Sequence, residues 1–121
     1  SMVARGNHIR GVTDGIFTWS DNFLVEDNYL HDFSTNGGNG HVDGFQTEGT
    51  SHGIIRHNVF EVEQGQTSAI AVWNSAGNSS DFQIENNLIA GGGFSIYAED
   101  YSQYSVTNIR YVNNKFSNAL Y

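Results

Sequence analysis

An asparagine recurs in the same context five times along the chain, and this repeat constrains the fold more than any other feature. It occupies the sixth position of five eight-residue segments, whose third position is mostly apolar and whose eighth is always large and apolar. Self-similarity over a whole chain is typical of repeat architectures, in which each repeat adds one structural unit. The segments span residues 2–9, 23–30, 53–60, 82–89 and 109–116, and their asparagines are Asn7, Asn28, Asn58, Asn87 and Asn114.

A second short segment lies between successive asparagine segments. Its second residue is always apolar, and its fourth is small or β-branched. Alternation with a period of two residues predicts a β-strand with one buried face. Each repeat therefore contains at least two strands separated by turns. These segments span residues 15–19, 44–48, 69–73 and 95–99.

The two kinds of segment together predict an all-β solenoid of about four to five coils. Equivalent strands of successive coils would pair in parallel, about 4.8 Å apart, with alternate side chains in a narrow core. An inward asparagine at a bend carries a donor and an acceptor, so identical amides one coil apart can form a hydrogen-bonded ladder. The ladder satisfies polar groups that would otherwise be buried without partners.

Leucine-rich repeats share part of this pattern, because their template also places an asparagine between apolar residues. The chain contains only four leucines, and no helical stretch fills the rest of each repeat. A second alternating strand is present instead. These observations exclude the leucine-rich repeat.

The chain resembles the right-handed parallel β-helix proteins of the pectate-lyase-like superfamily, in particular its secreted bacterial members. The stretches HVDGFQTEG (41–49), IIRHNVF (54–60) and IENNLIAGGG (84–93) carry the resemblance, which covers nearly the whole chain. It implies a right-handed β-helix, a secreted or cell-surface location and a polysaccharide or oligosaccharide partner. The superfamily includes lyases, hydrolases, epimerases and non-catalytic binders, so the resemblance does not select one activity.

The charge of the chain narrows the classes of ligand. Thirteen acidic residues against five basic ones give a formal net charge of −8. Nucleic acid is disfavoured because its phosphates need a basic patch, whereas a cation, or a neutral or cationic ligand, is compatible. The absence of cysteine excludes disulfides and thiolate metal clusters. No apolar run approaches the length of about 20 residues that a membrane-spanning helix needs.

The resemblance implies a carbohydrate site on one exposed sheet, flanked by the longer loops, and the second strands supply candidate residues for it. Aromatic faces stack on sugar rings, and carboxylates bind hydroxyl groups or act as acid and base. The alternative is that the tryptophans pack under neighbouring loops. One predicted outward row contains Phe17, Gln46, Ala71 and Tyr97, and the next contains Trp19, Glu48, Trp73 and Glu99. We expect Trp19, Gln46, Trp73 and Tyr97 to bind the sugar.

The stretch 41–48 contains the densest group of titratable side chains. If the chain is a polysaccharide lyase or glycoside hydrolase, we expect Glu48 or Asp43 as acid or base and His41 as a partner in proton transfer. Glu99 is the second candidate carboxylate, because two coils place its backbone roughly 9–10 Å from that of Glu48, near the carboxylate separation of inverting glycosidases. An alternative is that Asp43, like Asp14, caps a turn before a strand.

Motifs of the known activities are missing from the chain. Polygalacturonases carry Asp-Asp, Gly-His-Gly and Arg-x-Lys motifs, whereas this chain has only SHG at 51–53. The arginine-based motif of the pectate lyases is also absent. The resemblance therefore assigns no catalytic residue. A non-catalytic scaffold, such as a piece of an adhesin, a tailspike or a surface solenoid, is the alternative function.

Metal binding and self-association complete the expectations. The five histidines show no tight ligand spacing, so we expect no histidine metal site and no cofactor, with Ca²⁺ held by carboxylates and loop carbonyls as the open alternative. The chain begins and ends inside a repeat, which predicts a single domain over residues 1–121 taken from a longer solenoid. Uncapped coil ends expose unpaired strand edges and predict self-association through them.

Overall fold

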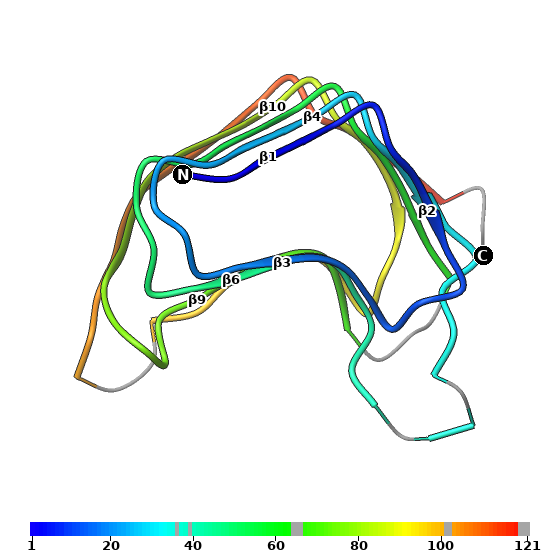
Figure 1. Ribbon diagram of the computed structural model, residues 1–121, viewed down its shortest axis with the longest axis horizontal. Helices are drawn as coiled ribbons and strands as arrows, with labels where there is room; N and C mark the ends of the chain where they lie inside the picture. Colours follow the sequence, from blue (N-terminus) through cyan, green and yellow to red (C-terminus); the bar gives the residue numbers. More distant parts are fainter. Residues whose placement is uncertain (36, 39, 64–66, 101–102, 119–121) are drawn as a thin grey trace.

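The computed structural model describes residues 1–35, 37–38, 40–63, 67–100 and 103–118, which form a parallel β-helix. Four coils of three strands each and part of a fifth are present in these ranges, and none of the described residues is helical. In Figure 1 the N-terminal coil faces the viewer and the chain runs clockwise as it recedes, so the β-helix is right-handed. The all-β solenoid predicted from the repeat is confirmed.

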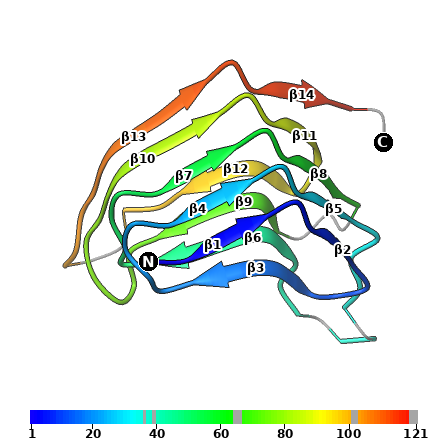
Figure 2. The same ribbon diagram turned by 45° about the horizontal axis from the view of Figure 1, so that its top comes forward.

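Three parallel sheets form the walls of the β-helix, and Figure 2 shows equivalent strands stacked coil upon coil. The first sheet contains β1 (Val3–Arg5), β4 (Leu24–Glu26), β7 (Ile54–Arg56), β10 (Ser79–Glu85) and β13 (Val106–Val112). The second contains β2 (His8–Arg10), β5 (Tyr29–His31), β8 (Val59–Val62), β11 (Leu88–Gly91) and β14 (Lys115–Ser117). The third contains β3 (Asp14–Thr18), β6 (Asp43–Glu48), β9 (Ser68–Trp73) and β12 (Phe94–Ala98). Each asparagine segment therefore supplies two strands, and the second predicted segment supplies the third.

The register of the sheets matches the alignment of the repeats residue by residue. In the first sheet the third positions of the asparagine segments pair in the order Ala4, Val25, Ile55, Ile84 and Tyr111. In the second sheet the eighth positions pair in the order Ile9, Leu30, Phe60, Ile89 and Phe116. Most of these side chains belong to the apolar core that runs along the axis.

The asparagines form the predicted ladder at the bend between the first two sheets. Each amide nitrogen donates to the amide oxygen of the next coil, over distances of 2.8, 2.9, 3.0 and 2.9 Å from Asn7 to Asn114. The three central asparagines, Asn28, Asn58 and Asn87, are buried. The ladder therefore supplies hydrogen bonds to polar groups that water does not reach.

The residue before each ladder asparagine turns the chain by adopting a positive φ. Only residues that tolerate the left-handed region stand there, because that conformation is costly for most side chains. These residues are Gly6, Asp27, His57, Asn86 and Asn113, with φ between 53° and 66°. His57 thus has a structural explanation at a corner of its coil.

A row of alternating charges follows the outer face of the first sheet. Arg5, Glu26, Arg56 and Glu85 are in register. Glu26 accepts from Arg5 at 2.7 Å and from Arg56 at 2.6 Å, and the hydrogen bond from Arg56 is the main reason that its pKa is lowered. Glu26 therefore connects Arg5 and Arg56 across three successive coils.

Candidate functional site

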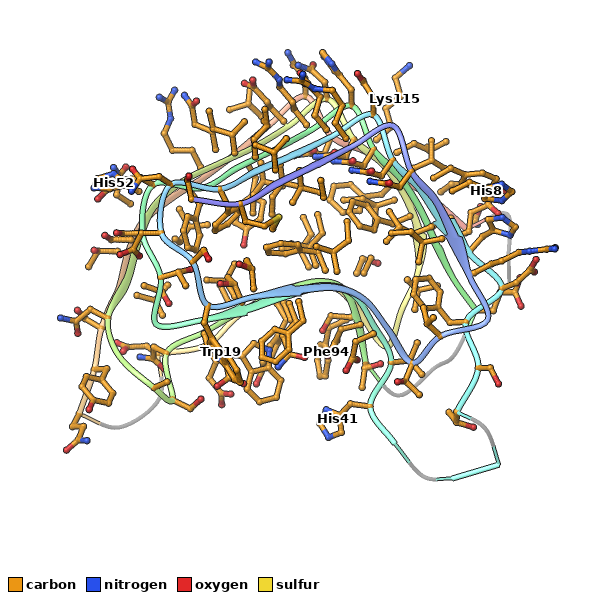
Figure 3. All side chains as sticks on the ribbon, in the orientation of Figure 1. His8, Trp19, His41, His52, Phe94 and Lys115 are labelled. Atoms are coloured by element: carbon orange, nitrogen blue, oxygen red, sulfur yellow. The ribbon has the colours of Figure 1, made fainter. Side chains whose placement is uncertain are left out.

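The outer face of the third sheet carries the two predicted rows of side chains. Phe17, Gln46, Ala71 and Tyr97 are paired in register across β3, β6, β9 and β12, and Glu48 is paired with Trp73 in the next row. Figure 3 shows Trp19, His41 and Phe94 on the outer side of this sheet. The register therefore brings aromatic and acidic side chains from different coils to one surface.

A pocket of about 110 Å³ lies on this face, and its walls are mostly aromatic. The ring centroids of His41 and Trp73 are 6.0 Å apart, those of Trp73 and Tyr97 are 5.8 Å apart, and those of Tyr97 and Phe94 are 5.2 Å apart. The remaining lining residues are Asp43, Thr67 and Ser68. Four rings from β9, β12 and the segment before β6 thus surround one carboxylate.

Asp43 is almost completely buried, with 1% of its surface exposed. Its Oδ1 accepts a hydrogen bond from the backbone N–H of Ser68 at 3.0 Å, whereas its Oδ2 has no partner among the described residues. Burial raises the pKa of Asp43 because the charged form loses its hydration, and the charge of Asp14 acts in the same direction. The Ser68 hydrogen bond and His41 partly oppose the rise. Asp43 therefore contributes to the pocket wall a carboxylate with one buried, unpaired oxygen.

The indole nitrogen of Trp73 is the second polar atom without a partner here. Its Nε1 is buried and has no hydrogen-bond acceptor among the described residues. Trp73 itself is half-buried and belongs to the lining of the pocket. Buried polar groups are normally hydrogen-bonded, so an unpaired donor and an unpaired acceptor on two residues that line one pocket point to a ligand with both functions.

A second hollow of about 300 Å³ shares Trp73 with this pocket and is lined also by Glu48, Ser75 and Glu99. Glu48 is held in place, because Ser75 Oγ donates to its Oε2 at 2.9 Å and Gln46 Nε2 donates to its Oε1 at 3.0 Å. The carboxylate of Glu99 accepts a hydrogen bond from Tyr97 and thereby raises the pKa of that phenol. The two predicted carboxylates, Glu48 and Glu99, therefore line one hollow.

The structure brings together most of the predicted site residues, but not all of them. His41, Asp43, Trp73 and Tyr97 line the pocket, and Glu48 and Glu99 line the adjoining hollow. Trp19 lies outside both; it is 69% exposed and contacts Phe17 edge-on, with ring centroids 4.8 Å apart. Trp19 is thus open to solvent, which contradicts the alternative that both tryptophans pack under loops. Trp73 is half-buried, so the alternative holds in part for Trp73 alone.

Phe94, Thr67 and Ser68 line the pocket but are absent from the predicted site. The strand register of the third sheet is the signal that could have identified Phe94 as a site residue. It pairs with Ser68, which belongs to the row that begins with Asp14 and Asp43, so a large ring stands in a row of small or acidic residues. Ser68 is the first residue of β9 and Thr67 precedes it, and neither carries a pattern that distinguishes it from a turn residue.

A histidine cluster on the second sheet was also missed. His8, Tyr29 and His31 stack there, and the Nε2 atoms of the two histidines are in contact. His31 Nδ1 also pairs with Asp32 at 2.8 Å. Within the described ranges, no three His, Asp or Glu side chains gather as ligands for a metal ion. We therefore propose no metal site on this cluster.

Comparisons of the chain with models of known protein families, with curated proteins and with solved structures returned no match. Among the described residues, no helix is long and apolar enough to span a membrane.

Replacing Asp43 with asparagine is expected to raise the free energy of unfolding at pH 7 by about 1 kcal/mol. The pKa of Asp43 is raised in the folded state, so its contribution to stability is present below its unfolded pKa and is lost as the pH rises through its folded pKa. Asparagine removes the buried charge and keeps an acceptor for the Ser68 N–H. Denaturant melts at pH 7 and pH 4 should show a gain that shrinks at the lower pH.

The exposed Asp14, which is paired with Asp43 in the sheet, provides the matched control. Asp14→Asn should change stability by no more than about 0.5 kcal/mol. A clear loss of stability in Asp43→Asn at pH 7 would instead identify Asp43 as a turn cap whose charge is needed by the fold.

Proposed function

We propose that the chain is an extracellular polysaccharide-binding β-helix related to the pectate-lyase-like superfamily. The observation that carries the proposal is the position of Trp73, whose half-buried side chain lines both an aromatic pocket and a hollow with two glutamates. Sugar binding sites combine flat apolar surfaces for the ring with polar groups for the hydroxyls, and both are present here.

The two hollows are suited to neighbouring parts of one oligosaccharide. The pocket of about 110 Å³ is smaller than the roughly 300–1,000 Å³ of typical ligand sites, so it accommodates one substituent or part of one ring. The hollow beside Glu48 and Glu99 has about 300 Å³, enough for more of the ligand. A chain of sugars would thus cross Trp73, stack on its ring and reach the carboxylates that line the two hollows.

Turnover as a lyase or glycoside hydrolase is a second candidate function, and the raised pKa of Asp43 favours it. A carboxyl group whose pKa is raised by burial, in a pocket that also contains an imidazole, is suited to act as a proton donor or acceptor. His41 lines the same pocket. Product analysis after incubation with a bound polysaccharide separates this function from binding alone, because only turnover yields shorter or unsaturated products.

The binding proposal predicts that Trp73→Ala lowers oligosaccharide affinity by about 100-fold, as expected for the loss of an aromatic residue at the centre of a site. A glycan array would identify a ligand, and calorimetric titration would give the affinities of both proteins. Tyr29→Ala is the matched control, because Tyr29 is a partly exposed aromatic residue on the second sheet, away from the pocket.

The control should bind as tightly as the unchanged protein, and circular dichroism should show that both variants are folded. Unchanged oligosaccharide affinity in Trp73→Ala would show that the sugar binds elsewhere on the protein. The absence of binding to any glycan on the array would favour the alternative of a structural or adhesive β-helix segment.

A further inference from the structure

Positive and negative side chains are distributed unequally over the three sheets. The third sheet has no arginine or lysine in its strands, whereas it contains Asp14, Asp43 and Glu48, with Glu99 directly after β12. All five basic residues lie in the other two sheets, at Arg5, Arg10, Arg56, Arg110 and Lys115. The face that carries the candidate site is therefore acidic, and no basic side chain of its strands can neutralise a ligand carboxylate.

The pocket on this face has the composition of a cation site. A buried carboxylate with an unpaired oxygen is costly, and an ammonium group would both neutralise the charge of Asp43 and donate to its Oδ2. Aromatic faces attract cations through their quadrupoles, and the rings of Trp73, Tyr97 and Phe94 line the same pocket. The carboxylate and the aromatic rings therefore both favour a cationic group.

We infer that this pocket binds the free ammonium group of an amino sugar, so that the recognised polysaccharide is cationic. The inference rests on the proposed sugar-binding function and names the class of sugar. An amino sugar places an ammonium beside a hydroxyl group, and these supply the donor for Asp43 and the acceptor for the Trp73 Nε1–H. A uronic acid is disfavoured because it brings a further negative charge to an acidic face. An N-acetyl sugar is disfavoured because its amide is neutral and larger than an ammonium group.

Glucosamine and N-acetylglucosamine are the first probes, because they differ only at the amine. The indole N–H signals of the ¹⁵N-labelled protein report on the two tryptophans separately: Trp73 lines the pocket, and Trp19 lies outside it. Glucosamine should shift the Trp73 signal, leave the Trp19 signal in place and bind at least about 10-fold more tightly than N-acetylglucosamine, the size of one well-formed ionic contact. Glucuronic acid should bind more weakly than either.

Two variants test whether the preference for glucosamine over N-acetylglucosamine depends on the Asp43 carboxylate. Asp43→Asn should abolish the difference between the two sugars, whereas Asp14→Asn, at the paired position of the neighbouring strand, should keep it. The charged or titratable side chains that face Asp43 are Asp14, His41 and Tyr97. Lowering the pH protonates Asp43, and the loss of its negative charge weakens the binding of a cation. Affinity should therefore begin to fall at a pH above the ordinary Asp value of 3.8.

Failure of this inference is distinguishable from failure of the proposed function. Equal or tighter binding of N-acetylglucosamine, or glycan-array binding without any response to glucosamine, would overturn the ammonium site and leave sugar binding intact. A response of the Trp73 signal to methylammonium, with no sugar bound by the protein, would support the ammonium site and overturn sugar binding. No response to either probe and no array binding would overturn both.

Discussion

Replacing Gly53 with alanine is expected to cost about 3 kcal/mol, at the upper end of the range for overpacked cores. A Cβ atom at this position would lie 2.0 Å from Cζ of Phe23. Phe23 and Phe82 occupy the equivalent positions one coil below and one coil above, and because residue 53 has no side chain their rings meet with centroids 5.4 Å apart. The Phe23 ring is 2% exposed and also contacts Phe45, so it cannot move aside without disturbing the core.

Denaturant melts of Gly53→Ala and Gly40→Ala provide the comparison. Gly40 has nothing within 4 Å of its added Cβ, so its substitution should change stability by no more than about 0.5 kcal/mol. Combining Gly53→Ala with Phe23→Leu should recover part of the loss, because the smaller side chain makes room for the methyl group. Equal stabilities of the two glycine variants would show that the Phe23 ring is not packed over residue 53.

Replacing Asn58 with alanine is expected to cost about 2–4 kcal/mol, because it removes the centre of the asparagine ladder. The Asn58 side chain accepts from the N–H and the amide of Asn28, and it donates to the Val25 carbonyl and to Asn87, all at 2.9–3.0 Å. Without it, the buried N–H of Asn28 loses its partner. Unsatisfied buried donors are more costly than the average hydrogen bond is stabilising.

Asn7, at the N-terminal end of the asparagine ladder, is the matched control for Asn58. Asn7 is exposed, and its side chain donates one hydrogen bond, to Asn28 at 2.8 Å. Asn7→Ala should therefore cost less than about 1 kcal/mol in the same melts. Costs of similar size at both positions would contradict the dependence on burial, and a negligible cost at Asn58 would mean that the ladder contributes little to stability.

The two kinds of buried polar group in this protein differ in how fully they are bonded. The central asparagines use both the donor and the acceptor of their amides. Asp43 and Trp73 each have a buried polar atom without a partner among the described residues, and both line the pocket on the third sheet. Proteins tolerate such local costs at functional sites, which is why these two atoms are the starting point for the ligand we propose.

The sequence by itself determined the coil and the register. Parallel stacking repeats the same environment once per coil, so each wall position imposes its own requirement: an asparagine at the bend, an apolar residue inside and an alternating charge outside. These requirements recur along the chain and can be aligned without a structure. The outward rows of Gln46 and Tyr97 and of Glu48 and Trp73 follow from the same alignment and were confirmed by the strand pairing.

Only the tertiary structure decided which outward residues form a site. Asp43 is buried, whereas its paired residue Asp14 is exposed, although both begin a strand with the same Asp-Gly pair. Asp43 lies on the inner strand β6 and shares its pocket with Trp73, Phe94 and Tyr97 of the later coils, whereas Asp14 lies on the edge strand β3. A repeat encodes what its coils have in common, but a pocket depends on how unlike side chains from neighbouring coils pack in three dimensions.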